Sequence, residues 1–319
     1  GHDDAAVFAM DLNPSTLEIC AGGDHSTVYR WTPKNELIES TAKFHSNEVS
    51  HVLFGKDGSL YTVSNDHTAI RWNMESGEAI TVYEAPCMLT CAALSEDEST
   101  LFVSGFDHVL AFNVASGELL WDAETERSEG LSICGNVVVA GSYNWLVWLD
   151  AETGKELHRS DPFADSFIFR WMQLDANTIA VAGYDDKQFF VWDVSNRAQI
   201  AAYALPASEK GGVCNESFGG GRIWASRWDK TVAVLDAQSG ELVKKLRLPG
   251  SYYPIAANAE GTRFVATSGG KARVYDGEYN HLGDFEHPGG LDCISFISED
   301  IAVGGASSGA VYIFDFSAG

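Results

Sequence analysis

The sequence predicts an all-β protein, a β-propeller of eight antiparallel blades, with seven blades as the alternative count. One residue, usually aromatic or Leu and followed by Asp, Asn or a short turn, returns every 37 to 43 residues. Apolar and polar residues alternate between these positions, and no segment shows helical spacing bounded by caps. This period and this alternation are typical of a four-stranded propeller blade. The recurring residues are Trp31, Trp72, Phe112, Leu149, Trp192, Leu235, Tyr275 and Phe314.

The second unit shows how four strands follow from the pattern. Gly58 and the pair Asn65-Asp66 favour tight turns, and short runs of apolar and β-branched residues lie on either side of them. The expected strands cover residues 49–54, 60–64, 69–72 and 79–83.

Four units continue after the recurring residue with Asn or Asp, and then with Ser or Thr directly before a glycine. An Asn or Asp side chain bonds the backbone two residues on, and glycine takes the positive φ that closes a hairpin. We therefore expect hairpin turns rather than phosphate-binding loops. The four turns run from Asn73 to Gly77, from Asn113 to Gly117, from Asp150 to Gly154 and from Asp236 to Gly240.

Composition limits the class of protein. The repeats make residues 1–319 a single domain, and no apolar stretch is long enough for a membrane span. Asp and Glu number 45 against 21 Lys and Arg, a formal charge of −24 that repels nucleic acid and anionic membranes. This acidity favours solubility or a basic protein partner. The 6 dispersed cysteines and the lack of a secretory signal indicate a reduced, intracellular protein, and we expect a cytoplasmic location.

These repeats resemble the WD-repeat (WD40) family over essentially the whole length of the chain, most strongly in unit two. His45, Ser64, Asp66 and Trp72 fall where that family has a structural tetrad of His, Ser or Thr, Asp and Trp. The resemblance implies that Asp66 accepts from His45, that His45 reaches Ser64, and that Trp72 donates its indole hydrogen. We interpret these four residues as structural, because a fully paired buried network needs no functional reason.

Other units depart from the WD pattern. His2 and His287 fill the His position in units one and eight, and Trp192-Asp193 gives the literal dipeptide in unit five. Units three, four and six also resemble the repeats of eight-bladed quinoprotein-type propellers, which expect a Trp after the glycine turn. Trp121 meets that expectation in unit three, whereas the other two units do not. The WD-repeat interpretation is preferred, with a quinoprotein-like enzyme or an envelope assembly scaffold as the alternative.

No catalytic, metal or cofactor site is predicted. His25, His67 and His108 each follow an Asp in the turn between the second and third strands of three successive units. Blades in a ring hold such turns beyond common coordination distance, so we expect no metal there. No pair of carboxylates has the fixed spacing that general acid–base work requires, and no serine has a hydrolase elbow.

Large side chains gather at the same turns and predict a partner-binding surface. In the WD-repeat family this turn lies on the narrow face, where partners commonly dock, and aromatics and Arg carry binding hot spots. The alternative is that these side chains pack between blades. We therefore expect a non-enzymatic scaffold or sensor that binds a protein or peptide on the narrow face. The candidate residues are Phe106, Tyr143, Trp145, Tyr184, Arg227 and Trp228.

The strand count predicts an incomplete last blade. The sequence supplies eight first, second and third strands but seven fourth strands, because it stops soon after Phe314. We expect the strand at 311–314 to have an unpaired edge. Such an edge indicates a domain of a longer chain, or one that accepts a strand from a partner.

Overall fold

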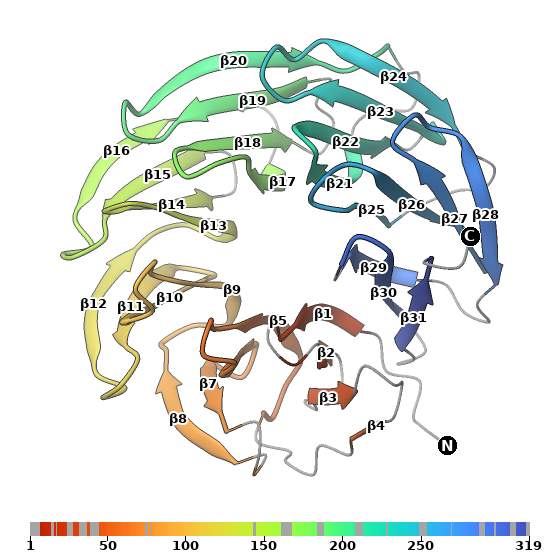
Figure 1. Cartoon of the computed structure of the whole chain (residues 1–319). Helices are drawn as coiled ribbons and strands as arrows, with labels where there is room; N and C mark the ends of the chain where they lie inside the picture. Colours follow the sequence, from red (N-terminus) through yellow and green to blue (C-terminus); the bar gives the residue numbers. More distant parts are fainter. Residues whose placement is uncertain are drawn as a thin grey trace. The chain divides into compact units, whose positions relative to one another are not determined.

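The structure of the chain is a computed structural model. It describes residues 7–13, 16, 18–23, 28–31, 37–38, 45–73, 76, 78–142, 145–160, 168–183, 188–207, 213–227, 229–248, 254–268, 270–286, 291–296, 298–306 and 311–316. Within these residues, consecutive strands form eight antiparallel sheets, or blades, seven of four strands and the last of three (Figure 1). The eight-blade prediction is confirmed, as is the three-stranded last blade.

The chain divides into two compact units. The first contains blades 1 to 4. Its strands are β1 (Val7–Leu12), β2 (Ile19–Gly23), β3 (Val28–Trp31), β4 (Leu37–Ile38), β5 (Val49–Phe54), β6 (Leu60–Ser64), β7 (Thr68–Trp72), β8 (Ala79–Glu84), β9 (Leu89–Leu94), β10 (Thr100–Gly105), β11 (His108–Asn113), β12 (Leu119–Glu124), β13 (Ser128–Cys134), β14 (Val137–Ser142), β15 (Trp145–Asp150) and β16 (Glu156–Ser160).

The second unit contains blades 5 to 8. Its strands are β17 (Ile168–Gln173), β18 (Thr178–Gly183), β19 (Gln188–Asp193), β20 (Ala198–Ala204), β21 (Val213–Gly219), β22 (Arg222–Arg227), β23 (Thr231–Asp236), β24 (Leu242–Arg247), β25 (Ile255–Ala257), β26 (Arg263–Ser268), β27 (Lys271–Asp276), β28 (His281–Glu286), β29 (Leu291–Phe296), β30 (Ile301–Ala306) and β31 (Val311–Asp315).

The hydrophobic core lies between neighbouring blades within each unit. The recurring residue is the last or next-to-last residue of the third strand of its blade, and from Trp72 to Phe314 each is at most 9% exposed. One cluster joins Tyr61 and Tyr83 of blade 2 to Leu101 and Phe112 of blade 3, and another joins Phe189 of blade 5 to residues of blade 6. The 40-residue period is therefore the period with which blades stack.

An aromatic side chain on the fourth strand fastens one blade to the next. Trp121 on β12 donates its indole hydrogen to the carbonyl of Ala151 at 2.9 Å, in the turn that ends at Gly154. A Cβ added to Gly154, whose φ is +70°, would lie 2.6 Å from the indole ring. Tyr203 on β20 donates to the carbonyl of Ala237 at 2.8 Å in the same way. The expected hairpin turn thus also serves as a docking site for the preceding blade.

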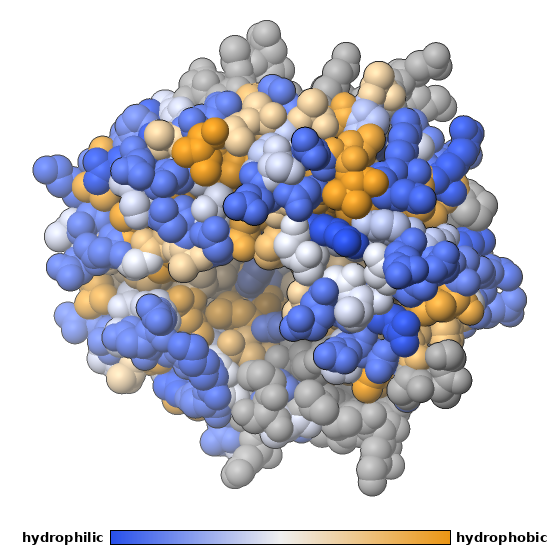
Figure 2. All heavy atoms as spheres, turned by 45° about the horizontal axis from the view of Figure 1, so that its top comes forward, coloured by the Kyte–Doolittle hydropathy of each residue, from blue (hydrophilic) through white to orange (hydrophobic). Residues whose placement is uncertain are grey.

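The outer strands carry the exposed large apolar side chains. Within the described residues these all lie on the fourth strands of their blades, and in Figure 2, where the top of Figure 1 comes forward, hydrophobic groups are separated by hydrophilic ones. Separated apolar side chains of this kind are normal for a protein surface. The residues are Ile80, Val82, Leu119, Leu120, Ile200, Leu242, Val243 and Leu282.

Candidate protein-binding surface

The buried polar network of blade 2 is present, but Thr62 takes the place predicted for Ser64. His45 Nδ1 lies 3.0 Å from Asp66 Oδ2, and His45 Nε2 lies 2.8 Å from Thr62 Oγ1. Trp72 Nε1 donates to the same Thr62 oxygen at 2.9 Å. Ser64 instead donates to the carbonyl of Asn47 and accepts the backbone N–H of Asp66. The assignment of Ser64 is therefore wrong, and its hydroxyl holds the turn.

Burial and hydrogen bonds together set the charges in this network. Burial lowers the pKa of His45 and outweighs the opposing effect of Asp66. Burial alone would raise the pKa of Asp66. Hydrogen bonds from Thr68, from the backbone of Ser46 and from His45 outweigh that effect, so the carboxyl pKa lies below its usual value. A carboxylate only accepts, so His45 Nδ1 carries the hydrogen and Nε2 accepts the Thr62 hydroxyl. This chain of bonds satisfies each member and gives the network a structural role.

The structure describes three of the six predicted partner-binding residues. Phe106 and Trp145 are half-buried, and each leaves part of its ring open to solvent. Tyr143, Tyr184 and Trp228 lie outside the described residues, so their part in binding stays a prediction.

Arg227 is buried, which corrects the exposure assumed for it. Only 1% of the residue is accessible, and Nη1 donates to the carbonyl of Pro206 at 2.5 Å. Burial lowers the pKa of its guanidinium, against the opposing charge of Asp229. Arg227 ends β22, the second strand of its blade, whose last five residues are all buried. A residue in this place packs the blade and does not meet a partner.

Phe106 and Trp145 join a set of charged side chains that sequence reasoning missed. The guanidinium of Arg127 lies 4.4 Å from the Phe106 ring centre, and that of Arg159 lies 3.7 Å from the Trp145 ring centre. Trp145 also donates its indole hydrogen to Glu126 Oε2 at 2.9 Å. We call Phe106, Glu126, Arg127, Trp145 and Arg159 the aromatic–arginine surface of blades 3 and 4.

Elements of both blades position this surface. Phe106 lies in the turn between β10 and β11, and residues 126 and 127 lie in the connection from β12 to β13. Trp145 begins β15, and Arg159 on β16 lies opposite Val147 of β15. The turns between second and third strands therefore meet the connection between blades 3 and 4. Pairs of an aromatic ring and a cation contribute about 0.5–1 kcal/mol where solvent reaches them.

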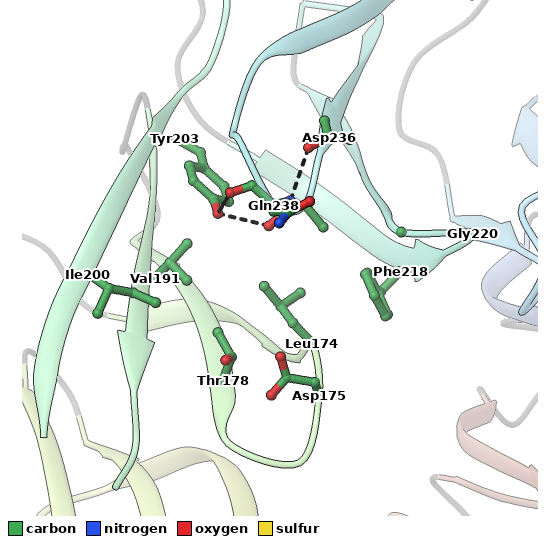
Figure 3. A pocket seen from close by; sticks show the side chains of 12 residues that line it. Leu174, Asp175, Thr178, Val191, Ile200, Tyr203, Phe218, Gly220, Asp236 and Gln238 are labelled. Carbon is green, nitrogen blue, oxygen red and sulfur yellow. Dashed lines mark hydrogen bonds between the residues drawn. The ribbon is translucent and has the colours of Figure 1, made fainter. Parts of the chain in front are cut away.

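A separate groove of about 540 Å³ lies between blades 5 and 6. Figure 3 shows Leu174 and Asp175 on one side of the opening, and Tyr203 and Gln238 on the other. The blade 5 turn between β17 and β18 and the blade 6 turn between β23 and β24 form its rims. No sequence signal pointed to this groove, because its lining comes from segments far apart along the chain.

Among the described residues, no three His, Cys, Asp or Glu side chains are grouped in a way that could hold a metal ion. Arg170 Nε lies 3.1 Å from Glu216 Oε2 on the innermost strands of blades 5 and 6, and burial raises the pKa of Glu216 to about 7. The cysteines form no disulfide within the described residues. The structure also has no helix, within the residues described, with the length and apolar character to cross a bilayer.

Comparison with known proteins agrees with this architecture. The computationally designed Ika8 protein matches with a TM-score of 0.82 at 20% identity, over 99% of this chain and 100% of that chain. Saccharomyces cerevisiae Sqt1 matches with a TM-score of 0.83 at 12% identity, over 98% of this chain and 96% of that one. These similarities and the eight sheets define the chain as an eight-bladed β-propeller.

One family model matches part of the chain. It describes the outer membrane protein assembly factor BamB and covers residues 105–200. That segment includes Trp121 and the turn from Asp150 to Gly154, the features on which the quinoprotein-type resemblance depends. No curated protein sequence matches the chain. A fold shared by unrelated proteins leaves function to be argued from the sites.

Proposed function

We propose that this chain is a non-enzymatic scaffold that binds a protein or peptide through the aromatic–arginine surface of blades 3 and 4. The observation that carries the proposal is the pairing of two half-exposed rings with two arginines at the predicted turns. Trp, Tyr and Arg are the residue types most enriched among binding hot spots. The proposal extends to a cytoplasmic location, as the sequence suggests.

The arrangement favours binding because the side chains are already ordered before a partner arrives. Trp145 contacts both Glu126, through its indole hydrogen, and the Arg159 guanidinium over its ring, so less rotational freedom remains to be lost on binding. The exposed carboxylate of Glu126 and the exposed guanidinium of Arg127 can pair with charges of either sign. A mixed polar surface with aromatic anchors suits a partner that dissociates again.

Quantitative affinity capture tests this proposal. The wild-type chain, Phe106→Ala, Trp145→Ala and the control Leu119→Ala are each used as bait in a lysate of cells that naturally contain the protein. Leu119 is 46% exposed on the outer strand β12, so its removal takes apolar surface from a different place in blade 3. We expect the two ring variants to lose the same partner, by at least tenfold, and the control to retain it.

Thermal melting shows whether the loss of the partner is specific. The unfolding free energy of Phe106→Ala and of Trp145→Ala should stay within about 1 kcal/mol of the wild type, because both rings lie at the surface. Equal capture by the wild type and both ring variants would contradict the proposal.

A second candidate function comes from the family match. The match to the BamB model over residues 105–200, with the docking of Trp121, supports a scaffold for outer membrane protein assembly. Cell fractionation separates the two candidates, because this one requires the chain in the cell envelope. A quinoprotein-like enzyme is the remaining alternative, and a bound chromophore in the absorbance spectrum of the purified protein would favour it.

A further inference from the structure

The groove between blades 5 and 6 combines an apolar lining with acidic rims. Leu174, Val191 and Phe218 form apolar walls, and Asp175 and Asp236 lie on the rims of the two blades. Figure 3 shows Asp175 across the opening from Gln238, which follows Asp236 in the same turn. The groove has room for a long side chain from outside the chain.

The two carboxylates differ in their surroundings. Asp236 Oδ1 accepts the backbone N–H of Ser239 at 2.8 Å, and Arg222 lies near enough to help keep the carboxyl pKa low. Asp175 Oδ1 accepts the backbone N–H of Asn177 at 2.7 Å. Among the described interactions, Asp175 has no ion pair with a cation of the chain, and the residue is exposed. Asp175 is therefore the rim carboxylate that is available to pair with a cation from outside the chain.

Apolar walls beneath an available carboxylate match the chemistry of one kind of side chain. Arginine and lysine bury an aliphatic stem while the charged head stays at the edge. The guanidinium of arginine also binds a carboxylate with two hydrogen bonds and stacks on aromatic rings such as Phe218. The formal charge of −24 attracts basic segments to the chain as a whole.

We propose that this groove binds an arginine side chain presented by a basic segment of a partner protein. The guanidinium pairs with Asp175, and the stem lies along Leu174, Val191 and Phe218. The groove is separate from the aromatic–arginine surface and belongs to the other unit of the chain. Binding at one of the two sites can therefore be disproved while binding at the other is retained.

Methyl NMR of the whole chain tests the groove directly. Ile200 lines the groove and is 58% exposed, whereas Ile80 is 51% exposed on β8 and serves as a matched reporter outside it. The probes are N-acetylarginine methylamide and its uncharged analogue N-acetylnorleucine methylamide, each titrated to millimolar concentration. We expect the arginine probe to shift the methyl signals of Ile200 and Leu174, and to leave that of Ile80 unchanged.

Two variants test the role of charge. Asp175→Asn should weaken binding of the arginine probe about threefold to fivefold, the usual range for an exposed ion pair. Glu152→Gln removes the same charge at an exposed turn of blade 4 and should leave binding unchanged. Equal shifts with both probes, equal shifts at Ile80 and Ile200, or unchanged affinity in Asp175→Asn would each overturn the proposal.

Discussion

Thr62 occupies the centre of the network in blade 2, since it meets both the indole hydrogen of Trp72 and Nε2 of His45. Sequence reasoning placed the hydroxyl two residues later. Successive side chains of a strand alternate between faces, so Thr62 and Ser64 point to the same side of β6, and the pattern alone could not separate them. The choice depends on where His45 lies, which is set by contacts across 17 residues of sequence.

Thr62→Val is therefore expected to destabilise the chain more than Ser64→Ala. Valine keeps the shape but leaves a buried donor and a buried acceptor unpaired, at about 2–3 kcal/mol, whereas the loss of one turn hydroxyl costs about 1 kcal/mol. Urea unfolding of both variants measures the difference. A larger loss in Ser64→Ala would restore the original assignment.

The histidines predict how stability changes with pH. Burial lowers the pKa of His45, and partial burial lowers that of His51 to about 4. A lowered pKa means that the unfolded chain binds more protons, so stability is present above pH 6.5 and is lost as the pH falls toward 4. We expect His51 alone to account for about 1 kcal/mol between pH 7.5 and 5.5.

Comparison of the wild type with His51→Gln isolates this contribution. Glu216 acts in the opposite direction, because its raised pKa makes the folded chain gain protons and stability as the pH falls below about 7. That contribution is common to both proteins and cancels in the difference. A difference in unfolding free energy that does not change with pH would contradict the assignment.

Among the elements, the hairpin turns that end at Gly117, Gly154 and Gly240 were predicted correctly, and their second role was not. The turn from Asn73 to Gly77 lies partly outside the described residues. The positive φ of +70° at Gly154 follows from the turn, but its contact with Trp121 also requires that the aromatic of the preceding blade reach it. Tyr203 was missed because the resemblance expects Trp. Tyrosine offers the same two properties, a flat ring and a hydrogen-bond donor.

Two glycines of blade 4 separate these roles. Gly135 and Gly154 both have positive φ, +59° and +70°, but an added Cβ meets nothing within 4 Å at Gly135 and the Trp121 ring at Gly154. We expect Gly135→Ala to cost about 1 kcal/mol from backbone strain, and Gly154→Ala to cost clearly more. Equal thermal destabilisation of the two variants would show that the docking of Trp121 adds little.

The three-stranded eighth blade was foreseen by counting strands. β31 pairs with β30, and among the described strands it has no second neighbour. Alternate amides of an edge strand face away from its partner, whereas β27 pairs on both sides. Hydrogen exchange should therefore be fast at alternate residues of β31 and slow throughout β27. Protection of every β31 amide would show that another strand covers the edge.

For the whole molecule, periodicity was enough to predict eight blades, because each blade repeats the same local pattern and buries the same recurring residue. The binding surface was only partly predictable. The turns that hold Phe106 and Trp145 repeat along the sequence, but Arg127 and Arg159 reach those rings from other elements. The burial of Arg227 follows the packing alternative, because both faces of a middle strand are covered by neighbouring blades.

The central claim is that a partner binds to the aromatic–arginine surface of blades 3 and 4. Hydrogen exchange of the chain, with and without the captured partner, tests it most directly, because it reports the location of contact as well as its strength. We predict slower exchange at residues 106–109, 125–128 and 145–147 in the complex. Protection confined to other blades, with these three segments unchanged, would contradict the account.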